Sequence, residues 1–415
     1  MTRRRAPLPA HRPLARRTVS RRRLTAAVVA SALLSGVLAG LTAAPAAAAA
    51  PPEGPAGDAF YTPPSPLPPG RPGDVIRRRV ASQTATSTTY LVLYRSTTAT
   101  GAPTAVSGTV AVPNGVDPAT APIVAVAPFT LGLGDQCAAS KQPLVGGLSV
   151  PATFLQRGYA VATTDYEGLG TPGVHTYVVG RSEGHAVLDV ARAAQRLGVG
   201  LSATAPIGLW GYSQGGGGAA WAGQLAASYA PELRIKGTAA GGVPADMIAV
   251  GKALDGGLGF GFLAAAAAGF DAAYPELDLN RYLNAAGRRA FADNADRCVA
   301  EVVAAFAFHR ISEYTTSNPM DRPDWRARLT ENSLGAVAPA APIYLYHGLF
   351  DEILPYAQAA ALWKTYCGKG GKVTFQMLLD DHVSGLLGGQ AAAAQFLVDR
   401  IAGKPAAGNC ALSGA

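Results

Sequence analysis

Apolar residues along the chain alternate between two periodicities. Nearly continuous apolar runs, typical of parallel strands buried on both faces, lie at 122–129 and 159–166. Further strands are predicted at 205–210, 235–240, 342–347 and 373–379. Stretches with helical periodicity lie between and after them, at 147–157, 183–197, 215–229, 355–367 and 387–401. This alternation predicts an α/β fold with a mostly parallel, doubly wound sheet.

Three segments depart from this rhythm. "TYLVLYRS" and "AVSGTVAVP" are rich in β-branched and aromatic residues and predict an antiparallel pair at a sheet edge. Residues 51–73 are rich in Pro and Gly and predict an extended surface arm. Residues 245–340 are Ala/Gly-rich and helical, with no convincing strand. We expect them to form a cap or lid, inserted into a core made of 74–244 and 341–415.

The first fifty residues have the layout of an export signal. They contain nine arginines and no acid, followed by an apolar run over 24–41 and by alanines at 46–50 that offer cleavage sites. "SRRRLT" at 20–25 resembles a twin-arginine signal. An uncleaved membrane anchor is the alternative, but the run is short for a span. We therefore expect a secreted, extracellular protein whose mature chain has no transmembrane anchor.

Removing this segment changes the sign of the net charge. The full chain has 35 basic and 27 acidic residues, a net charge of +8. Without the nine arginines the balance is 26 − 27 = −1, which gives no support to nucleic-acid binding. Four cysteines follow the signal, and an even number in an exported protein favours disulfides. No pair has C-x-x-C spacing, so we predict no zinc or other metal site.

"GYSQGGGGAA" at 211–220 fits both a nucleophile elbow, G-x-S-x-G, and a phosphate-binding glycine loop. The phosphate reading fails because no G-K-[ST] follows and no lysine is near. Ser213 stands between the apolar run "APIGLWG" and a helical segment, as an elbow requires. "GRSEG" at 180–184 also matches, but a Gly/Pro-broken loop precedes it. We predict that Ser182 is a helix N-cap, with Glu183 in the first turn.

A serine nucleophile needs a base and an orienting acid. Of the six histidines, His382 is the best candidate because it follows the last predicted strand in a polar loop, "LDDHVSG". Asp351 in "YHGLFDEILP" completes the order Ser, Asp, His of the α/β-hydrolases. The remaining histidines of the mature chain are predicted to be structural or solvated, with a packed, hydrogen-bonded role for His347. Weaker rivals to the acid are Glu352, Asp380 and Asp381.

The oxyanion donors follow from the same geometry. The backbone N–H of Gln214, the residue after the nucleophile, is the first expected donor. The second is expected in the loop after "IVAVAP", at Thr130 or Leu131, with the Asp135 side chain as an outside candidate.

Together these residues resemble the secretory lipase family of α/β-hydrolases. The resemblance spans nearly the whole mature chain and includes "GDQCAAS", "TTDYEGLGTPGVHTYVVGRSEGHAVLDVARAA", "GYSQGG" and "HGLFDEILP". It implies the α/β-hydrolase fold and a family disulfide from the oxyanion loop to the cap, here Cys137 to Cys298, leaving Cys367 to Cys410. On the sequence alone all three pairings of the four cysteines stay open.

The resemblance also implies an activity. It implies hydrolysis of triacylglycerols or other carboxylic esters through an acyl-enzyme on Ser213, with Asp351 and His382 completing the triad. The expected partner is an ester or lipid substrate, met at a lipid–water interface in the case of a lipase, and no cofactor is required. A secreted serine peptidase could use the same triad, and a binding protein without catalysis is a third hypothesis. We also expect the run Gly216 to Gly218 to let its helix pack close to the sheet.

Overall fold

A computed structural model describes residues 50–142 and 149–414, so the predicted export signal, Ala50 excepted, lies outside the described residues. The strands that it describes form one sheet of nine, in the order β1-β2-β3-β5-β4-β6-β7-β8-β9. Their bounds are β1 Val75–Gln83, β2 Ser87–Thr97, β3 Pro103–Pro113, β4 Ile123–Ala127, β5 Ala160–Thr164, β6 Pro206–Tyr212, β7 Arg234–Gly241, β8 Ile343–Gly348 and β9 Val373–Leu378.

The sheet is antiparallel at one side and parallel over the rest. β1, β2 and β3 pair antiparallel, and β3 pairs antiparallel with β5. From β5 to β9 every pairing is parallel. The expected antiparallel pair is β2 and β3, but it does not lie at the edge, because β1 covers it. The sequence pattern did not predict β1, because its sequence, "VIRRRVASQ", contains three consecutive arginines. Charged residues of this kind are common on strands at an exposed sheet edge.

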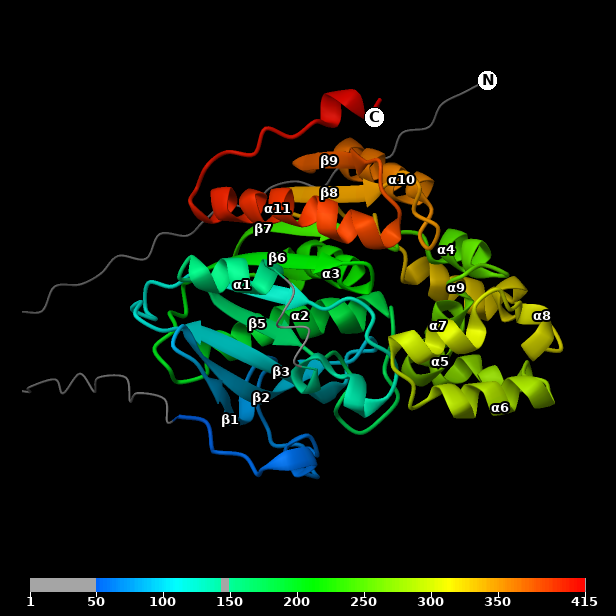
Figure 1. The fold of residues 1–415 in the computed structure, drawn as a ribbon, viewed down its shortest axis with the longest axis horizontal. Coiled ribbons are helices and arrows are strands. Elements are labelled where there is room, and N and C mark those ends of the chain that lie inside the picture. The colour runs from blue at the N-terminus through cyan, green and yellow to red at the C-terminus, as the bar shows by residue number, and fades with distance from the viewer. Residues whose placement is uncertain (1–49, 143–148, 415) are drawn as a thin grey trace, which may run out of the picture. The chain divides into compact units, whose positions relative to one another are not determined.

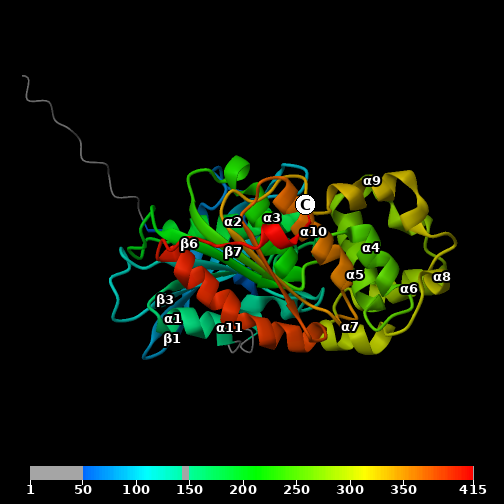
Figure 2. The same ribbon diagram turned by 90° about the horizontal axis from the view of Figure 1, so that it is seen from above.

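Helices cover both faces of the sheet, as Figures 1 and 2 show. One face carries α1 (Ser149–Gln156) and α11 (His382–Ile401), whose Phe154, Ala393 and Leu397 pack on β4, β6 and β8. The other face carries α2 (Gly180–Gln195), α3 (Gln214–Tyr229) and α10 (Tyr356–Gly368), which form the largest apolar cluster. This layered arrangement is the predicted doubly wound α/β fold.

The interval 245–340 is helical and contains no strand, and every residue in it is described. Its helices gather beyond the ends of the parallel strands in Figure 1, green to yellow. They are α4 Met247–Leu254, α5 Phe260–Ala273, α6 Ala285–Asn294, α7 Val299–Phe306, α8 Ile311–Tyr314 and α9 Pro323–Glu331. α4, α5, α6 and α9 share a core built around Phe270, Tyr274 and Trp325, which also includes Tyr177 and Val179 from the sheet domain. α7 and α8 pack on α5 in a separate cluster of Phe260, Phe306 and Ile311. We refer to these helices as the cap.

The Pro/Gly-rich segment at 51–73 is mostly exposed, and two aromatic residues anchor it to the sheet. A short 3-10 helix, Gly57–Phe60, carries Phe60 into full burial, and Tyr61 beside it is also buried. Both pack against Leu91, Leu93 and Ala105 of the antiparallel strands. The segment is therefore anchored by aromatic residues that the abundance of proline obscures in the sequence.

Across the described ranges, no helix combines the length and the apolar character needed to cross a membrane.

Candidate active site

Ser213 occupies a sharp turn between β6 and α3. Its φ of 57° and ψ of −123° lie in a region that non-glycine residues rarely adopt. The turn is held on both sides, because Ser213 N–H donates to Gly241 O at 2.9 Å and Gly217 N–H donates to Ser213 O at 3.0 Å. This strained strand-turn-helix geometry is that of a nucleophile elbow.

Glycines make the turn possible because backbone atoms approach them closely. A Cβ at Gly211 would lie 2.0 Å from Gly215 O, and one at Gly215 would lie 2.0 Å from Ala127 O. A Cβ at Gly216 would lie 2.1 Å from Gly241 O, so α3 fits between β4 and β7 only because Gly215 and Gly216 carry no side chain. The expected close packing holds at Gly216. It is looser at Gly217, whose Cβ would meet only side-chain carbons of Pro244, at 3.1 Å.

A chain of hydrogen bonds joins Ser213, His382 and Asp351. His382 Nδ1 lies 2.8 Å from Asp351 Oδ2, and His382 Nε2 lies 2.9 Å from Ser213 Oγ. A carboxylate can only accept, so Nδ1 carries the hydrogen and Nε2 keeps the lone pair that faces the hydroxyl. This arrangement can pass the hydroxyl proton to the imidazole and stabilise the resulting imidazolium.

Asp351 is fixed by its own loop. Its side chain is fully buried, and Oδ1 accepts from the backbone N–H groups of Ile353 and Leu354 at 3.0 and 2.7 Å. His347 Nε2 donates to Leu354 O at 2.8 Å and lies 3.3 Å from Asp351 Oδ2, which matches the packed role expected for it. Burial lowers the pKa of His347, so it contacts the carboxylate as a neutral imidazole.

His382 does not lie in a loop as expected but is the first residue of α11. Asp381 caps that helix by accepting from Ser384 N–H at 2.7 Å, and this starts the helix five residues earlier than the pattern predicted. Two of the three rivals to the acid have other partners: Glu352 Oε2 accepts from His382 N–H at 3.1 Å, and Asp381 caps the helix. Tyr212 Oη donates to His382 O at 2.6 Å, so both ends of the histidine backbone are held.

A buried polar network surrounds the side chain of Gln214. Its Nε2 donates to His175 Nε2 at 2.9 Å and to Glu183 Oε1 at 2.8 Å. His175 Nδ1 in turn donates to Glu167 O at 3.0 Å, and Glu183 Oε1 also accepts from Val178 N–H at 2.9 Å. Burial raises the pKa of Glu183 to about 8 and lowers that of His175 to about 4. Both groups are therefore predominantly uncharged at neutral pH.

Ser182 belongs to this region but is not the expected N-cap. Helix α2 begins at Gly180, after Val179, which gives no side-chain cap bond. Ser182 lies inside the first turn, buried, and its Oγ donates to Glu167 Oε2 at 2.5 Å. The expectation was wrong because the partner of Ser182 is the half-buried carboxylate of Glu167, in the loop before the helix, rather than the N–H groups of its own helix.

The expected oxyanion donors lie at the elbow and in the loop after β4. Gln214 opens α3, so its N–H is among the first N–H groups, which have no partner within the helix. Thr130 and Leu131 are both buried, and Thr130 Oγ1 lies 2.7 Å from Tyr177 Oη. The Asp135 side chain instead accepts from Gly170 N–H at 2.9 Å and lines a separate polar pocket with Asp58 and Lys141. The oxyanion role of these residues stays a prediction.

Two disulfides connect all four cysteines. Cys137 is joined to Cys298, and Cys367 is joined to Cys410. The first ties the loop after β4 to the start of α7, where Leu133 N–H donates to Arg297 O and Val299 N–H donates to Leu131 O, at 2.9 and 2.7 Å. The loop that holds the predicted oxyanion donors is thereby fastened to the cap. No group of His, Cys, Asp or Glu side chains suited to a metal ion occurs within 50–142 and 149–414.

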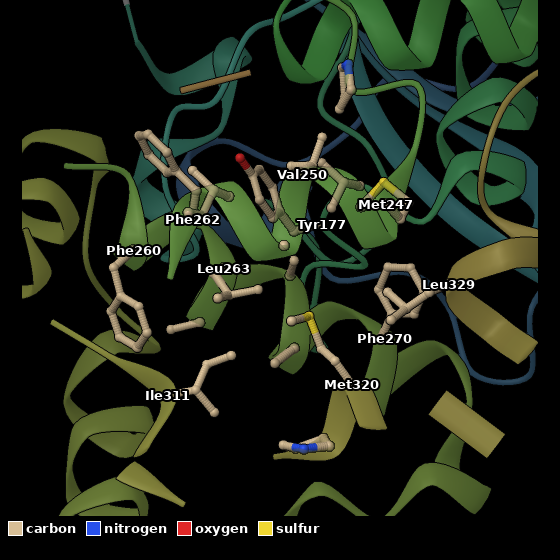
Figure 3. A pocket seen from close by; sticks show the side chains of 18 of the residues that line it. Tyr177, Met247, Val250, Phe260, Phe262, Leu263, Phe270, Ile311, Met320 and Leu329 are labelled. Atoms are coloured by element: carbon tan, nitrogen blue, oxygen red, sulfur yellow. The ribbon is translucent and has the colours of Figure 1, made fainter. Parts of the chain in front are cut away.

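Ser213 and Gln214 line a cavity that extends into the cap. Its walls come from α4 and α5, from the loops around α8 and α9, and from Tyr177, Ile353 and Leu354 of the sheet domain. Figure 3 shows that the side chains facing the cavity are almost all hydrocarbon or thioether groups. The labelled ones are Tyr177, Met247, Val250, Phe260, Phe262, Leu263, Phe270, Ile311, Met320 and Leu329. The cavity therefore brings the Ser213 side chain against mainly apolar groups.

Comparison with known proteins agrees with this geometry. Residues 148–409 match the family described as "Secretory lipase". The chain is also 30% identical to Lipase 10 of Candida albicans, over 86% of this chain and 83% of that protein. The chain belongs to the secretory lipase family. Another relative, 29% identical over 85% of this chain and 83% of its own length, is named a probable inactive lipase of Mycobacterium tuberculosis.

The fold of this family member matches a solved relative. Lipase A of Candida antarctica in its closed state superposes with a TM-score of 0.76 at 27% identity, covering 83% of this chain and 86% of that one. The α/β-hydrolase fold is thus confirmed. Because one relative is named a probable inactive lipase, the family alone does not identify the catalytic residues. They have to be argued from the geometry of the site.

Several residues at the site carry no recognisable signal in the sequence. His175 and Glu183 belong to a loop and a helix start whose pattern does not distinguish buried from solvated polar groups. Tyr212 and Glu352 contact His382 through its backbone, and backbone contacts follow no side-chain pattern. These residues could be identified only as polar groups placed in apolar surroundings. Those surroundings are created by tertiary packing and are not visible in the sequence.

Proposed function

We propose that the protein is a secreted serine lipase or esterase that hydrolyses triacylglycerols or other carboxylic esters. The observation that carries the proposal is the hydrogen-bonded series Ser213, His382 and Asp351, of which Ser213 lines an apolar cavity. Membership of the secretory lipase family supports both the reaction class and an extracellular location. The reaction needs no metal or organic cofactor.

The reaction would run in two halves. Ser213 Oγ attacks the ester carbonyl while His382 Nε2 takes its proton, and Asp351 stabilises the imidazolium. The imidazolium then protonates the leaving alcohol, which departs and leaves an acyl-enzyme on Ser213. A water molecule, deprotonated by His382, attacks the acyl carbonyl. The bond to Ser213 Oγ then breaks, the imidazolium returns the proton to Oγ, and the fatty acid is released.

The negative charge of the tetrahedral intermediate needs donors. The Gln214 N–H, at the positive end of α3, would supply the first, and an N–H at Thr130 or Leu131 the second. The role of the Gln214 side chain would be positional, because its bonds to His175 and Glu183 hold the residue that carries the first donor.

The cavity supports an acyl substrate. Binding a hydrocarbon chain among the α4 and α5 side chains removes apolar surface from water, at roughly 0.8 kcal/mol per methylene group buried. A polar peptide would find few hydrogen-bond partners there. This favours an ester of a fatty acid over a peptide substrate.

The test is a substrate panel on the purified mature chain. We expect turnover of p-nitrophenyl esters, with kcat/KM rising from acetate toward medium-length acyl chains, and little turnover of p-nitroanilide amides. Ser213→Ala should lower kcat by at least about 10⁴-fold. Robust amide cleavage with negligible ester turnover would replace the lipase by a peptidase. Stoichiometric binding of fatty acyl ligands without any turnover would instead place the chain with the inactive relative.

A further inference from the structure

Large apolar side chains are exposed on the two segments that carry Asp351 and His382. Five of them share this location and are 37 to 72% exposed: Leu349, Phe350, Leu379, Val383 and Leu387. We call these five residues the apolar collar. Large exposed apolar groups that gather in one place mark an interaction surface more often than scattered ones do.

The two segments run side by side. Leu349 N–H donates to Leu378 O at 2.8 Å, and Phe350 N–H donates to Asp380 O at 3.1 Å. Val383 and Leu387 stand four residues apart in the first turns of α11 and so share one helix face. The collar therefore belongs to one rim of the site, the rim that supplies the acid and the base of the proposed triad.

Among the residues that the structure describes, the opposite end of the sheet has no such gathering. Three exposed apolar residues lie there singly: Val116 before β4, Val337 before β8, and Leu412 beside the start of β9. Each belongs to a different segment, at the amino ends of the parallel strands. They provide a matched comparison for the collar, with exposed fractions of 37, 53 and 77%.

The charges on the collar segments have one sign. Residues 349–352 and 378–388 include Glu352, Asp380 and Asp381 beside the buried Asp351, and no lysine or arginine. A surface of this kind is repelled by anionic lipid, whose attraction for proteins depends on basic groups. It suits an apolar surface without net charge. A second copy of the chain is a poorer occupant, because a symmetric contact would bring these acids together and cover His382.

We propose that the apolar collar docks the enzyme on the surface of uncharged lipid, such as a triacylglycerol droplet. The proposal rests on the proposed lipase function and adds the surface through which it reaches insoluble substrate. Docking by this rim brings His382, and Ser213 hydrogen-bonded to it, toward the lipid from which an acyl chain must be drawn. Exposed apolar groups that enter a lipid layer contribute binding in proportion to the area buried.

The test compares two triple variants. The collar variant is Phe350→Gln, Leu379→Gln and Leu387→Gln, and the control variant is Val116→Gln, Val337→Gln and Leu412→Gln. Binding is measured by flotation with a triolein emulsion coated with phosphatidylcholine, in a Ser213→Ala background so that the lipid is not consumed. Hydrolysis of triolein and of soluble p-nitrophenyl acetate is measured with Ser213 intact.

We expect the collar variant to bind the emulsion at least tenfold more weakly, while its kcat/KM on p-nitrophenyl acetate stays within twofold of the parent. The control variant should bind like the parent, and adding phosphatidylglycerol to the coating should weaken parental binding severalfold. If the triple variant fails to fold, Phe350→Gln and Leu379→Gln singly should each weaken binding about two- to threefold.

Equal binding by parent and collar variant, or equal loss in the control variant, would overturn the docking proposal. So would a parental dimer, seen by sedimentation velocity, that the collar substitutions dissociate without changing lipid binding. Failure of the proposed function looks different: the parent would then cleave neither p-nitrophenyl acetate nor triolein. A parent that cleaves both, with binding indifferent to the collar, would refute docking alone.

Discussion

Replacing Glu183 by glutamine should make the protein less sensitive to alkaline pH. Glu183 is buried, and Oε1 accepts from Val178 N–H and from Gln214 Nε2. Glutamine keeps an oxygen in that position and cannot ionise. Burial raises the pKa of Glu183 from 4.5 to about 8, so the folded protein holds a proton that the unfolded chain releases over this range.

The sign and size of the effect follow from proton linkage. Where the folded state binds one proton more than the unfolded state, the free energy of unfolding falls by about 1.4 kcal/mol per pH unit. The stability is complete below pH 4.5 and is lost as the pH rises through about 8. Over that window the wild type should lose roughly 3 to 5 kcal/mol that Glu183→Gln retains.

Urea unfolding at intervals from pH 5 to pH 9, followed by tryptophan fluorescence, measures this difference. The raised pKa values of Asp165, Glu167 and Asp189 act in both proteins and cancel in the comparison. Glu53→Gln makes the same chemical change at an exposed position and serves as the control. A difference between wild type and Glu183→Gln that does not change with pH would refute the reasoning. So would a variant that is the less stable of the two at pH 8.5.

Three further predictions concern the elbow, the acid and the disulfide. Gly216→Ala should lower the free energy of unfolding by roughly 2 kcal/mol or more, because its Cβ would meet Gly241 O. Gly217→Leu should cost less, about 1 kcal/mol or somewhat more, and equal costs in chemical denaturation would contradict the packing described. Asp351→Asn should lower kcat about 10⁴-fold with little change in KM on a soluble ester, and an unchanged kcat would remove Asp351 from the triad. Replacing Cys137 and Cys298 by serine opens a loop of 161 residues and should cost about 5 kcal/mol on chain-entropy grounds, so an unchanged melting temperature would show that the cap is held without it.

The sequence predicts the layers of the fold because burial on both faces leaves a clear mark on β4, β5, β6 and β8. It misses β1, where three arginines on an exposed edge resemble a loop. It also places the start of α11 too late, because the signal for that start is the capping bond of Asp381 to Ser384 rather than apolar periodicity. Local sequence patterns predict which residues are buried, but they do not predict individual hydrogen bonds.

The site shows the same division. Ser213, Asp351 and His382 could be selected because each follows a strand that the apolar pattern identifies, and parallel strands bring their carboxyl ends together. The contacts of Gln214 with His175 and Glu183 could not, since they join residues 39 and 31 positions apart through packing of α2 against α3. The expectation for Ser182 was wrong for the same reason, because its partner Glu167 lies in the loop between β5 and α2 and meets it only through the folding of that loop.

The central claim is that Ser213 is the nucleophile, and covalent labelling tests it most directly. The mature chain is treated with a fluorophosphonate, digested, and the modified peptide located by mass spectrometry, with Ser182 in the second G-x-S-x-G match as the internal comparison. We predict a single adduct on Ser213, formed in step with loss of esterase activity, and no adduct in Ser213→Ala. Labelling of Ser182, or full inactivation with Ser213 unmodified, would contradict the account.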